Sequence, residues 1–387
     1  MTPLIQTYPL LQMASGDALK VQMYRFQGTQ PGPMVYIQAN LHGAEVVGNA
    51  VIQQLMTYLQ GCDPAVLWGE IRLVPVCNPL GLNLRSHHFA SGRYNPYDGR
   101  DWNRIFWDFS HQGEDILAFA LAHQHLAPEV IAQRYRQRLL TCFQRELDRL
   151  DRGAGAPVHE RYRSRLQALA LEANIVIDLH SSSDRGLVYA YYFRDREDWA
   201  ATFGLDFALL SDREDGAAFD EAFIKPWLAL ESALIALGRP LRFDVAAWTL
   251  ELGNAMDLQP AAVQRGLSGV LNYLRHRGIL SDRPPVQTDS IRYTRTSCLT
   301  KYHAPTGGFV QGRVEPGTWV QTGEHLYDLL CFNKTGALPE LRPVSAATAG
   351  LVYDVALNAA VNEGEYVLAT LVPMDPPAPQ YLQAPVV

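Results

Sequence analysis

The sequence predicts an α/β fold: a mostly parallel or mixed sheet sandwiched by helices, followed by a small C-terminal all-β barrel or sandwich domain. Two observations predict it. Short apolar, β-rich runs alternate with longer helical patterns from about residue 19 to 280, and Gly-, Val- and Thr-rich alternating runs replace the helices after that. Alternation of strands with helices favours parallel strands, because each parallel connection has to cross over the sheet. The 387 residues are 48% hydrophobic, enough for a large buried core.

The elements of the first part follow from the spacing of apolar residues. Residues 34–39 (MVYIQA) are β-rich, residues 46–59 carry apolar side chains at helical spacing, and residues 70–79 (EIRLVPVCNP) form the next expected strand. Two later strands, at residues 174–180 (NIVIDLH) and 243–253 (FDVAAWTLELG), again end in polar residues. These four runs are the expected centre of the sheet.

A helical insertion is expected from about residue 108 to 173. The segment carries charges at helical spacing, which is typical of an exposed amphipathic face rather than of a charged binding patch. The Gly/Ala/Pro stretch at residues 153–158 (GAGAPV) should divide it into two helical segments.

The composition and the apolar pattern of the chain change at the polar, Pro-containing residues 281–289 (SDRPPVQTD). Beyond them, residues 304–330 are echoed by residues 346–371, each with a small-Gly turn, a strand, a Val-x-x-Gly turn and a closing strand. Two such halves make a small β domain. We therefore expect three parts: a catalytic domain at 1–288, a β domain at 289–375, which we interpret as a cover or assembly surface for the pocket, and a disordered or loosely docked tail at 376–387.

Composition argues against several classes of function. Lys and Arg number 33 against 40 Asp and Glu, a net charge of −7 without basic blocks, so neither nucleic acid nor a membrane is an expected partner. No run approaches the ~18 apolar residues of a membrane span, and the N-terminus lacks the basic region of a signal peptide. The five cysteines never form a CxxC pattern. They predict reduced thiols and a cytoplasmic protein.

The residues that could carry chemistry lie where apolar strands end. His42 and Glu45 follow the first strand as an H-x-x-E pair, and His180 follows the strand IVID. The carboxyl ends of parallel strands share one edge of a sheet, where ligands bind. Two imidazoles and a carboxylate make a His₂Glu zinc site with a fourth position for water, and Gly43 would let backbone and metal approach closely. Asp178 could orient His180, unless its side chain lies on the other face of the strand.

Glu251, in the apolar run TLELG, is the candidate acid/base. A carboxylate at the end of a buried strand is costly unless it is paired or functional. One interpretation is a salt bridge to an arginine. The other is a general base that takes a proton from zinc-activated water and returns it to the leaving nitrogen.

Residues 93–106 (RYNPYDGRDWNRIF) supply an arginine-rich segment. An Asn-Arg pair such as Asn103 and Arg104 is suited to clamp a substrate carboxylate, because guanidinium binds carboxylate through two hydrogen bonds. A further arginine would stabilise the oxyanion of the scissile carbonyl. The segment taken alone is equally well interpreted as a surface loop with Arg-Asp pairs.

The motifs HGAE, DWNR, DLHSSS and TLELG, in this order, resemble the signatures of the M14 metallocarboxypeptidase superfamily. They are most similar to its aspartoacylase/succinylglutamate desuccinylase branch, over about residues 20–280, and members of that branch also carry a β-rich tail domain. The resemblance implies a zinc carboxypeptidase-like fold. It also implies zinc ligands at His42, Glu45 and His180, carboxylate binding by Asn103 and Arg104, and acid/base catalysis by Glu251. It assigns the carbonyl-polarising role best to Arg93, with Arg85 and Arg100 as alternatives.

Together these features predict a zinc-dependent amidohydrolase, with one Zn²⁺ per chain, that deacylates an N-acyl amino acid or a related small carboxylate. The alternative is a metallocarboxypeptidase that trims peptide C-termini, which a pocket closed by the C-terminal domain would oppose. A catalytically silent binding protein that uses the β domain as its interaction surface is a third hypothesis. An exposed β domain would permit a homo-oligomer without requiring one.

Overall fold

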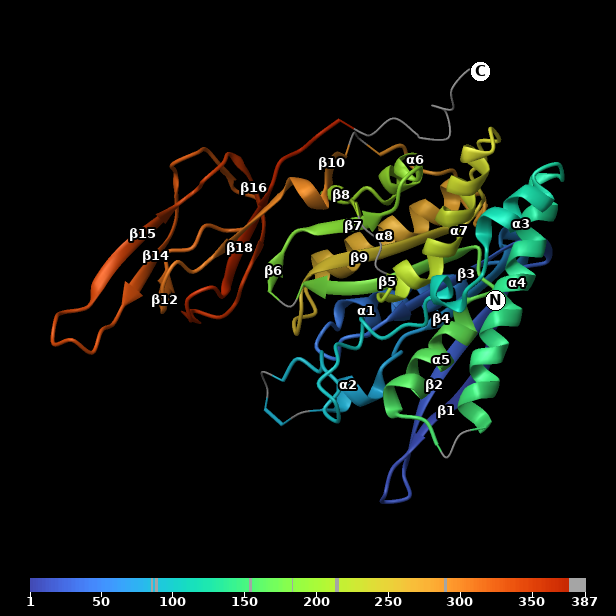
Figure 1. Cartoon of the computed structure of the whole chain (residues 1–387), viewed down its shortest axis with the longest axis horizontal. Coiled ribbons are helices and arrows are strands. Elements are labelled where there is room, and N and C mark those ends of the chain that lie inside the picture. Colours follow the sequence, from blue (N-terminus) through green and yellow to red (C-terminus); the bar gives the residue numbers. More distant parts are fainter. Residues whose placement is uncertain are drawn as a thin grey trace.

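The computed structural model describes residues 1–84, 86–87, 90–152, 155–182, 184–212, 216–288 and 291–375. Figure 1 shows a larger part in which helices surround a sheet and a smaller part of strands, drawn in orange and red, that projects from one side of it. The smaller part lies beside the strand ends of the larger sheet, close to β6 (Arg185–Gly186). It is therefore placed where it can border a site at that edge.

The larger part is built on a mixed sheet to which nine strands of the described residues contribute, in the order β1-β2-β4-β3-β5-β9-β7-β8-β10. The bounds are β1 (Leu4–Gln12), β2 (Ala18–Gln27), β3 (Gln30–Ala39), β4 (Trp68–Val74), β5 (Ile175–Ser182), β7 (Val188–Tyr192), β8 (Phe207–Leu210), β9 (Ala246–Asn254) and β10 (Arg292–Arg295). The four strands expected at the centre, β4, β3, β5 and β9, are neighbours and run parallel. The α/β prediction is thus confirmed.

Antiparallel strands flank this parallel centre. β1 and β2 form a hairpin that pairs with β4, and β7 runs antiparallel to β9. The hairpin was not expected from the sequence. Most of the side chains of β1 are exposed, so its apolar residues do not form the continuous run that marks a buried strand.

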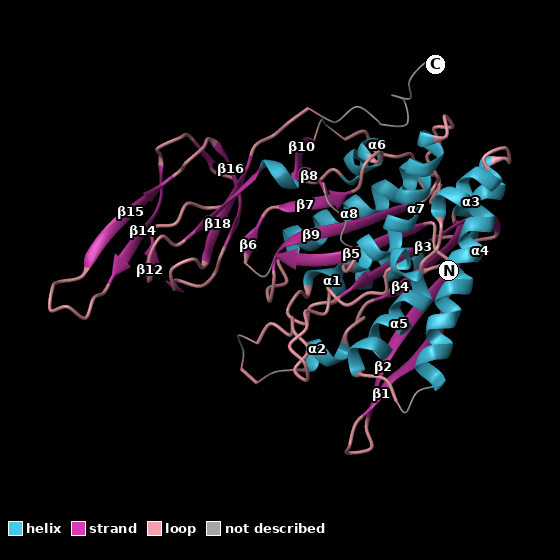
Figure 2. Cartoon of the chain, viewed as in Figure 1, coloured by secondary structure: helices cyan, strands magenta, loops and turns pink. Residues whose placement is uncertain are grey.

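Helices cover both faces of the sheet (Figure 2). Helices α1 (Val47–Gln60) and α8 (Pro260–His276) pack on one face, in a core with Val35, Ile177 and Trp248. The other face packs against α3 (Ile116–His123), α4 (Pro128–Arg152), α5 (Val158–Ala170) and α7 (Phe219–Ala236). Short helical turns complete the part: α2 (Pro79–Asn83), α6 (Glu197–Ala200), and 3₁₀ turns at Pro64–Val66, Phe109–Gln112, Ala201–Phe203 and Thr296–Cys298.

The segment predicted to be helical consists of α3, α4 and α5, so that prediction is confirmed, although with three helices where two segments were expected. α4 ends at Arg152 and α5 begins at Val158, on either side of the Gly/Ala/Pro stretch. The extra break falls at residues 124–127, before Pro128, which can begin a helix but cannot continue one.

The C-terminal strands form two antiparallel sheets, ordered β11-β18-β16-β13 and β15-β14-β12-β17. Their bounds are β11 (Leu299–His303), β12 (Gly308–Gln311), β13 (Trp319–Val320), β14 (His325–Cys331), β15 (Glu340–Ser345), β16 (Gly350–Val355), β17 (Ala360–Val361) and β18 (Tyr366–Leu371). Each half of the sequence repeat gives a long, a very short and a long strand. The halves interlock, because β17 pairs with β12 and β13 with β16. Both sheets contribute to one core, which contains Val310, Leu329, Val352 and Leu368.

The two parts are joined by strand pairing and by packing. β6 pairs with β16, and a buried cluster combines Tyr189 and Phe207 of the large sheet with Tyr353 and Leu371 of the C-terminal strands. A domain boundary near residue 289 stays a prediction, and the expected tail at 376–387 lies outside the described residues. The five cysteines are all free thiols, and none of the helices among the described residues is long and apolar enough to cross a membrane.

Candidate active site

The candidate residues lie at the carboxyl ends of adjacent strands, on the face of the sheet toward α7. On β5, β9 and β7, the side chains of His180, Glu251 and Tyr189 stand in one row across the sheet. The next row contains Asp178, Thr249 and Tyr191. Neighbouring residues such as Leu250 point to the opposite face and join the core under α1 and α8. The alternation of the strands therefore directs all six polar groups to one side.

His42 and Glu45 lie in the turn between β3 and α1. Asn40 begins this turn with a positive φ of 70°, and its side-chain amide donates to the carbonyls of His42 and Gly43 at 3.2 and 3.0 Å. Gly43 provides a close approach to protein backbone. A Cβ at Gly43 would lie 2.2 Å from the carbonyl oxygen of Gly81, so only glycine fits.

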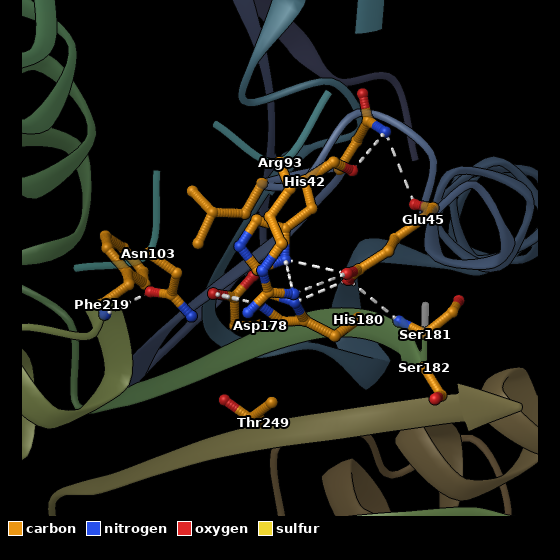
Figure 3. A network of polar contacts seen from close by, with 12 residues as sticks. His42, Glu45, Arg93, Asn103, Asp178, His180, Ser181, Ser182, Phe219 and Thr249 are labelled. Atoms are coloured by element: carbon orange, nitrogen blue, oxygen red, sulfur yellow. Dashed lines mark hydrogen bonds and ion pairs between the residues drawn. The ribbon is translucent and has the colours of Figure 1, made fainter. Parts of the chain in front are cut away.

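His42, Glu45 and His180 converge on one buried point (Figure 3). The Nδ1 atoms of His42 and His180 each lie 2.8 Å from a different oxygen of the Glu45 carboxylate. Their ligand atoms all lie within 4.8 Å of one another. The donor set, two imidazoles and one carboxylate with both imidazoles presenting the same nitrogen, matches the composition of a catalytic zinc site.

The outer nitrogens of both imidazoles also face carboxylates. His42 Nε2 is 3.0 Å from Asp101 Oδ1, and His180 Nε2 is 3.0 Å from Asp178 Oδ2. Asp178 therefore lies on the same face as His180, which settles the question that the sequence left open. Carboxylates in these positions fix ring orientation and make the inner nitrogens better ligands.

The charges of this group reinforce one another. Burial on its own would raise the pKa of Glu45, but the imidazoles of His42 and His180 lower it well below its ordinary value. Burial would likewise lower the pKa of His42, but the Glu45 and Asp101 carboxylates raise it. Glu45 is therefore ionised, as a metal ligand must be.

Arg93 lies beside this group. Its Nε donates to Asp101 Oδ2 at 3.0 Å, and its Nη1 is 3.4 Å from His42 Nδ1 and 3.8 Å from Glu45 Oε1. Asp101 thus holds Arg93 and His42 at once. The chain between Arg93 and the Asn-Arg pair forms a loop that closes with a bridge between Tyr94 and Asp101.

The alternative arginines differ from Arg93. Arg100 points away, with its Nη1 3.3 Å from His159 Nε2 and its Nε 3.8 Å from Asp98, and it does not line the cavity. Arg85 lies outside the described residues. Among the described arginines of this segment, Arg93 is the one that reaches the His/Glu group.

Asn103 and Arg104 stand side by side at the cavity wall. The backbone N–H of Phe219 donates to Asn103 Oδ1 at 2.9 Å, which fixes the amide so that its NH₂ group points toward the other labelled site residues (Figure 3). Arg104 Nη1 donates to the carbonyl of Asn103 at 2.6 Å, and both residues line the cavity. Two adjacent donor groups of this kind suit a carboxylate.

Glu251 faces the same cavity without a partner. Its Oε2 is buried and accepts no hydrogen bond, and no arginine or lysine of the described residues forms an ion pair with it. Burial raises the pKa of Glu251 to about 7, with Glu45 and Asp354 adding to the rise and His180 opposing it. The salt-bridge interpretation is therefore not supported, and a carboxyl with this pKa can both accept and donate a proton near neutrality.

All seven candidate residues line one cavity of about 570 Å³. Its far wall comes from the C-terminal strands and consists of Lys301, Tyr353, Asp354 and Tyr366. Asp354 joins the two parts, since it accepts hydrogen bonds from Ser182 of β5 and from Tyr366 of β18, both at 2.5 Å. The C-terminal part thus lines the pocket, and its role as a cover or assembly surface stays a prediction.

Several cavity residues were missed in the sequence. Asp101, which contacts His42 and Arg93 from behind the cavity wall, carries a signal that could have found it, because it begins the DWNR motif. Asp354 and Tyr366 carry none, because their position depends on how the C-terminal sheets dock. Asp220 and Tyr191 resemble ordinary residues of a helix start and a strand.

Comparison with known proteins agrees with this geometry. The family model described as the succinylglutamate desuccinylase/aspartoacylase catalytic domain matches residues 31–277. A search of curated protein sequences finds no match. Among solved structures, a protein from Shewanella amazonensis SB2B assigned to the succinylglutamate desuccinylase/aspartoacylase family is 31% identical. The alignment covers 96% of this chain and all of the other, with a TM-score of 0.86.

Two further structures are similar. A protein from Shewanella frigidimarina NCIMB 400, assigned to the same family, is 31% identical over 97% of this chain and 100% of its own, with a TM-score of 0.88. The product-bound ectoine utilization protein EutE (DoeB) from Ruegeria pomeroyi covers 96% of this chain and 95% of its own at 15% identity and a TM-score of 0.63, so it shares the fold. The chain belongs to the succinylglutamate desuccinylase/aspartoacylase family, a branch of the M14 metallocarboxypeptidase superfamily.

Proposed function

We propose that this protein is a zinc-dependent amidohydrolase that removes the acyl group from an N-acyl amino acid or a related small carboxylate. One observation carries the proposal: the buried group of His42, Glu45 and His180 shares a cavity with Glu251, whose buried Oε2 has no hydrogen-bond partner among the described residues. Family membership supports hydrolysis of an amide of this kind. We also propose that the fold is zinc carboxypeptidase-like and that the residues named in the next two paragraphs have the roles that this resemblance implies.

The proposed metal is one Zn²⁺, held by His42 Nδ1, His180 Nδ1 and the Glu45 carboxylate. Two imidazoles with one carboxylate suit zinc better than calcium or magnesium, which prefer oxygen ligands. When bound, zinc supplies a Lewis acid that activates water and polarises the scissile carbonyl.

The chain's own residues divide the remaining work. Glu251 accepts the proton of the attacking water and donates it to the departing nitrogen, because its raised pKa suits both transfers. Arg93 stabilises the oxyanion from beside the His/Glu group. Asn103 and Arg104 hold the substrate carboxylate, so that the amide lies between Glu251 and Arg93.

The C-terminal wall argues against the carboxypeptidase alternative. Lys301, Tyr353, Asp354 and Tyr366 line one side of the cavity. We propose that this wall admits a small substrate and obstructs an extended peptide. An intact set of polar groups with an unpaired Glu251 also argues against a silent binding protein. The free cysteines favour a reducing compartment, and we propose the cytoplasm.

The test is amine release from a panel of N-acetyl, N-formyl, N-succinyl and longer N-acyl amino acids by the zinc-loaded protein, with trimming of peptide C-termini measured beside it. The proposal predicts release from at least one acyl class and no trimming. Trimming without deacylation would assign the protein to the carboxypeptidases. Zinc binding with neither reaction would contradict both hypotheses.

A further inference from the structure

The cavity contains more negative groups than the proposed reaction needs. Its described lining includes three cationic side chains, Arg93, Arg104 and Lys301, but six carboxylates: Glu45, Asp184, Asp220, Glu221, Glu251 and Asp354. Glu45 and Glu251 are accounted for by the metal and by proton transfer. Asp354 accepts hydrogen bonds from Ser182 and Tyr366. Asp184 accepts a hydrogen bond from the backbone N–H of Leu357 at 3.2 Å.

Asp220 has a different environment. It lies in the first turn of α7, is only 6% exposed, and lines the cavity. Its Oδ1 accepts from the backbone N–H of Glu221 at 2.9 Å, and its Oδ2 accepts from Thr249 Oγ1 at 2.7 Å. Each oxygen therefore keeps a further acceptor site. No arginine, lysine or histidine of the described residues forms an ion pair with it.

No cationic side chain of the described residues neutralises the Asp220 carboxylate through an ion pair. Burial raises the pKa of Asp220 and the Asp178 carboxylate adds to the rise, whereas the hydrogen bonds from Thr249 and the Glu221 backbone and the charge of His180 oppose it. A buried carboxylate without a cation is costly, and a protein keeps one where a ligand supplies the cation. The start of a helix offsets part of this cost through its dipole, which is the competing structural explanation.

The position of Asp220 defines which part of the substrate it meets. The preceding residue, Phe219, holds Asn103 through its backbone N–H, so Asp220 lies next to the proposed clamp for the substrate carboxylate. On the other side, Thr249 stands two residues before Glu251 on β9 and bonds to Asp220 directly. Asp220 is therefore tied to the proposed clamp on one side and, through Thr249, to the strand of Glu251 on the other.

We propose that Asp220 is a specificity-determining residue that binds a cationic side chain in the amino-acid part of the substrate. The inference rests on the proposed deacylation and names its substrate class: diamino acids acylated on the α-nitrogen, with a free ω-ammonium group. The ammonium group donates to the remaining acceptor sites of Asp220, while Asn103 and Arg104 hold the α-carboxylate.

The test compares ligands that differ only in the ammonium group. The zinc-loaded protein is titrated calorimetrically with L-ornithine and L-norvaline, the expected type of product, and is assayed for amine release from their Nα-acetyl forms. We expect at least tenfold tighter binding of ornithine and at least a tenfold higher kcat/KM for its acetyl form. Asp220→Asn should lower both ratios at least tenfold, whereas Asp220→Glu should keep part of the preference.

Asp148→Asn is the matched control, because Asp148 is an exposed carboxylate on α4 away from the cavity; its ratios should equal those of the wild type. Equal affinity of the wild type for ornithine and norvaline would overturn the inference. So would an Asp220→Asn variant that weakens both ligands by the same factor, as expected if Asp220 only stabilises the start of α7. Preferential binding of ornithine without turnover of any N-acyl amino acid would instead contradict the proposed function and still support the role of Asp220 in binding the ammonium group.

Discussion

Glu251 and His180 stand opposite each other on neighbouring strands, yet their environments differ. His180 is enclosed between the Glu45 and Asp178 carboxylates, at 2.8 and 3.0 Å. Glu251 has no such partner in the described part of the chain, where its buried Oε2 accepts no hydrogen bond. One strand thus holds the imidazole that we propose as a metal ligand, and the next holds the carboxylate that we propose as the proton carrier.

The pH dependence of activity should follow the ionisation of the Glu251 carboxyl. Burial raises the pKa of this carboxyl to about 7, so the basic form exists above that pH and is lost as the pH falls through it. We expect kcat/KM for an N-acyl amino acid to decline tenfold per pH unit well below about pH 7, measured at constant zinc occupancy. A profile that stays flat down to pH 5 would contradict this assignment.

Metal retention should depend on His180. His180→Ala removes one of three proposed ligands and leaves Glu45 and Asp178 beside the space that the imidazole occupied. Zinc bound after dialysis should therefore fall from one per chain to near zero. Elemental analysis of purified protein measures this directly. His325→Ala, at an exposed histidine of β14, is the control and should retain full zinc; equal retention by both variants would argue against His180 as a ligand.

At the scale of residues, the sequence predicts those side chains whose position follows from the end of a strand. His42, Glu45, His180 and Glu251 all follow apolar runs, and parallel strands bring such ends to one edge. Asp101 and Asp220 could not be predicted in this way. Their positions depend on a loop that folds back to His42 and on a helix that packs over the sheet.

Among the elements, α7 matters most for the site because it supplies Phe219 and Asp220. A buried ion pair fixes this helix to the turn just before α6, and a hydrogen bond fixes it to the loop that precedes β9. Arg196 Nη1 and Nη2 donate to the two oxygens of Glu231 at 2.8 and 2.7 Å, and Glu231 also accepts from the backbone N–H of Phe243 at 2.9 Å. Both side chains are almost completely buried.

Removing one partner of this pair should be costly. Glu231→Gln leaves the Arg196 charge buried and uncompensated, and the free energy of unfolding should fall by about 3–5 kcal/mol. Urea denaturation followed by circular dichroism measures the change. In Glu340→Gln, which breaks an exposed pair with Arg342 on β15, the midpoint should not move. A similar result for both variants would show that the buried pair does not stabilise the fold.

The sequence predicts the central strands and the helical insertion because both carry strong periodic patterns. It does not predict the β1–β2 hairpin or the antiparallel β7. These strands have partly exposed or short apolar runs, and their pairing is decided by the neighbours that they find in the folded sheet.

For the whole molecule, the important feature is that the cavity belongs to both parts. The repeat in the last hundred residues predicts two similar β halves, and the structure contains them. It could not predict that β16 pairs with β6 or that Asp354 reaches Ser182, because docking of one part on another leaves no local pattern.

Loosening this docking should affect catalysis as well as stability. Leu371→Ala opens a gap in the cluster that contains Tyr189 and Tyr353, both cavity residues, so we expect a loss of about 2–5 kcal/mol and a lower kcat/KM. Leu55→Ala, in the core under α1, should cost similar stability with unchanged kcat/KM at a temperature where both variants are folded. Equal kcat/KM for the two variants would show that the C-terminal wall takes no part in catalysis.

The central claim is that Glu251 and a zinc ion held by His42, Glu45 and His180 act together in deacylation. The most direct measurement is amine release from the best N-acyl amino acid by the wild type and by Glu251→Gln, with the zinc content of both determined. The account predicts that the variant keeps one zinc per chain while kcat falls by a factor of about 10²–10⁴. Turnover within a few-fold of the wild type, with zinc fully bound, would contradict it.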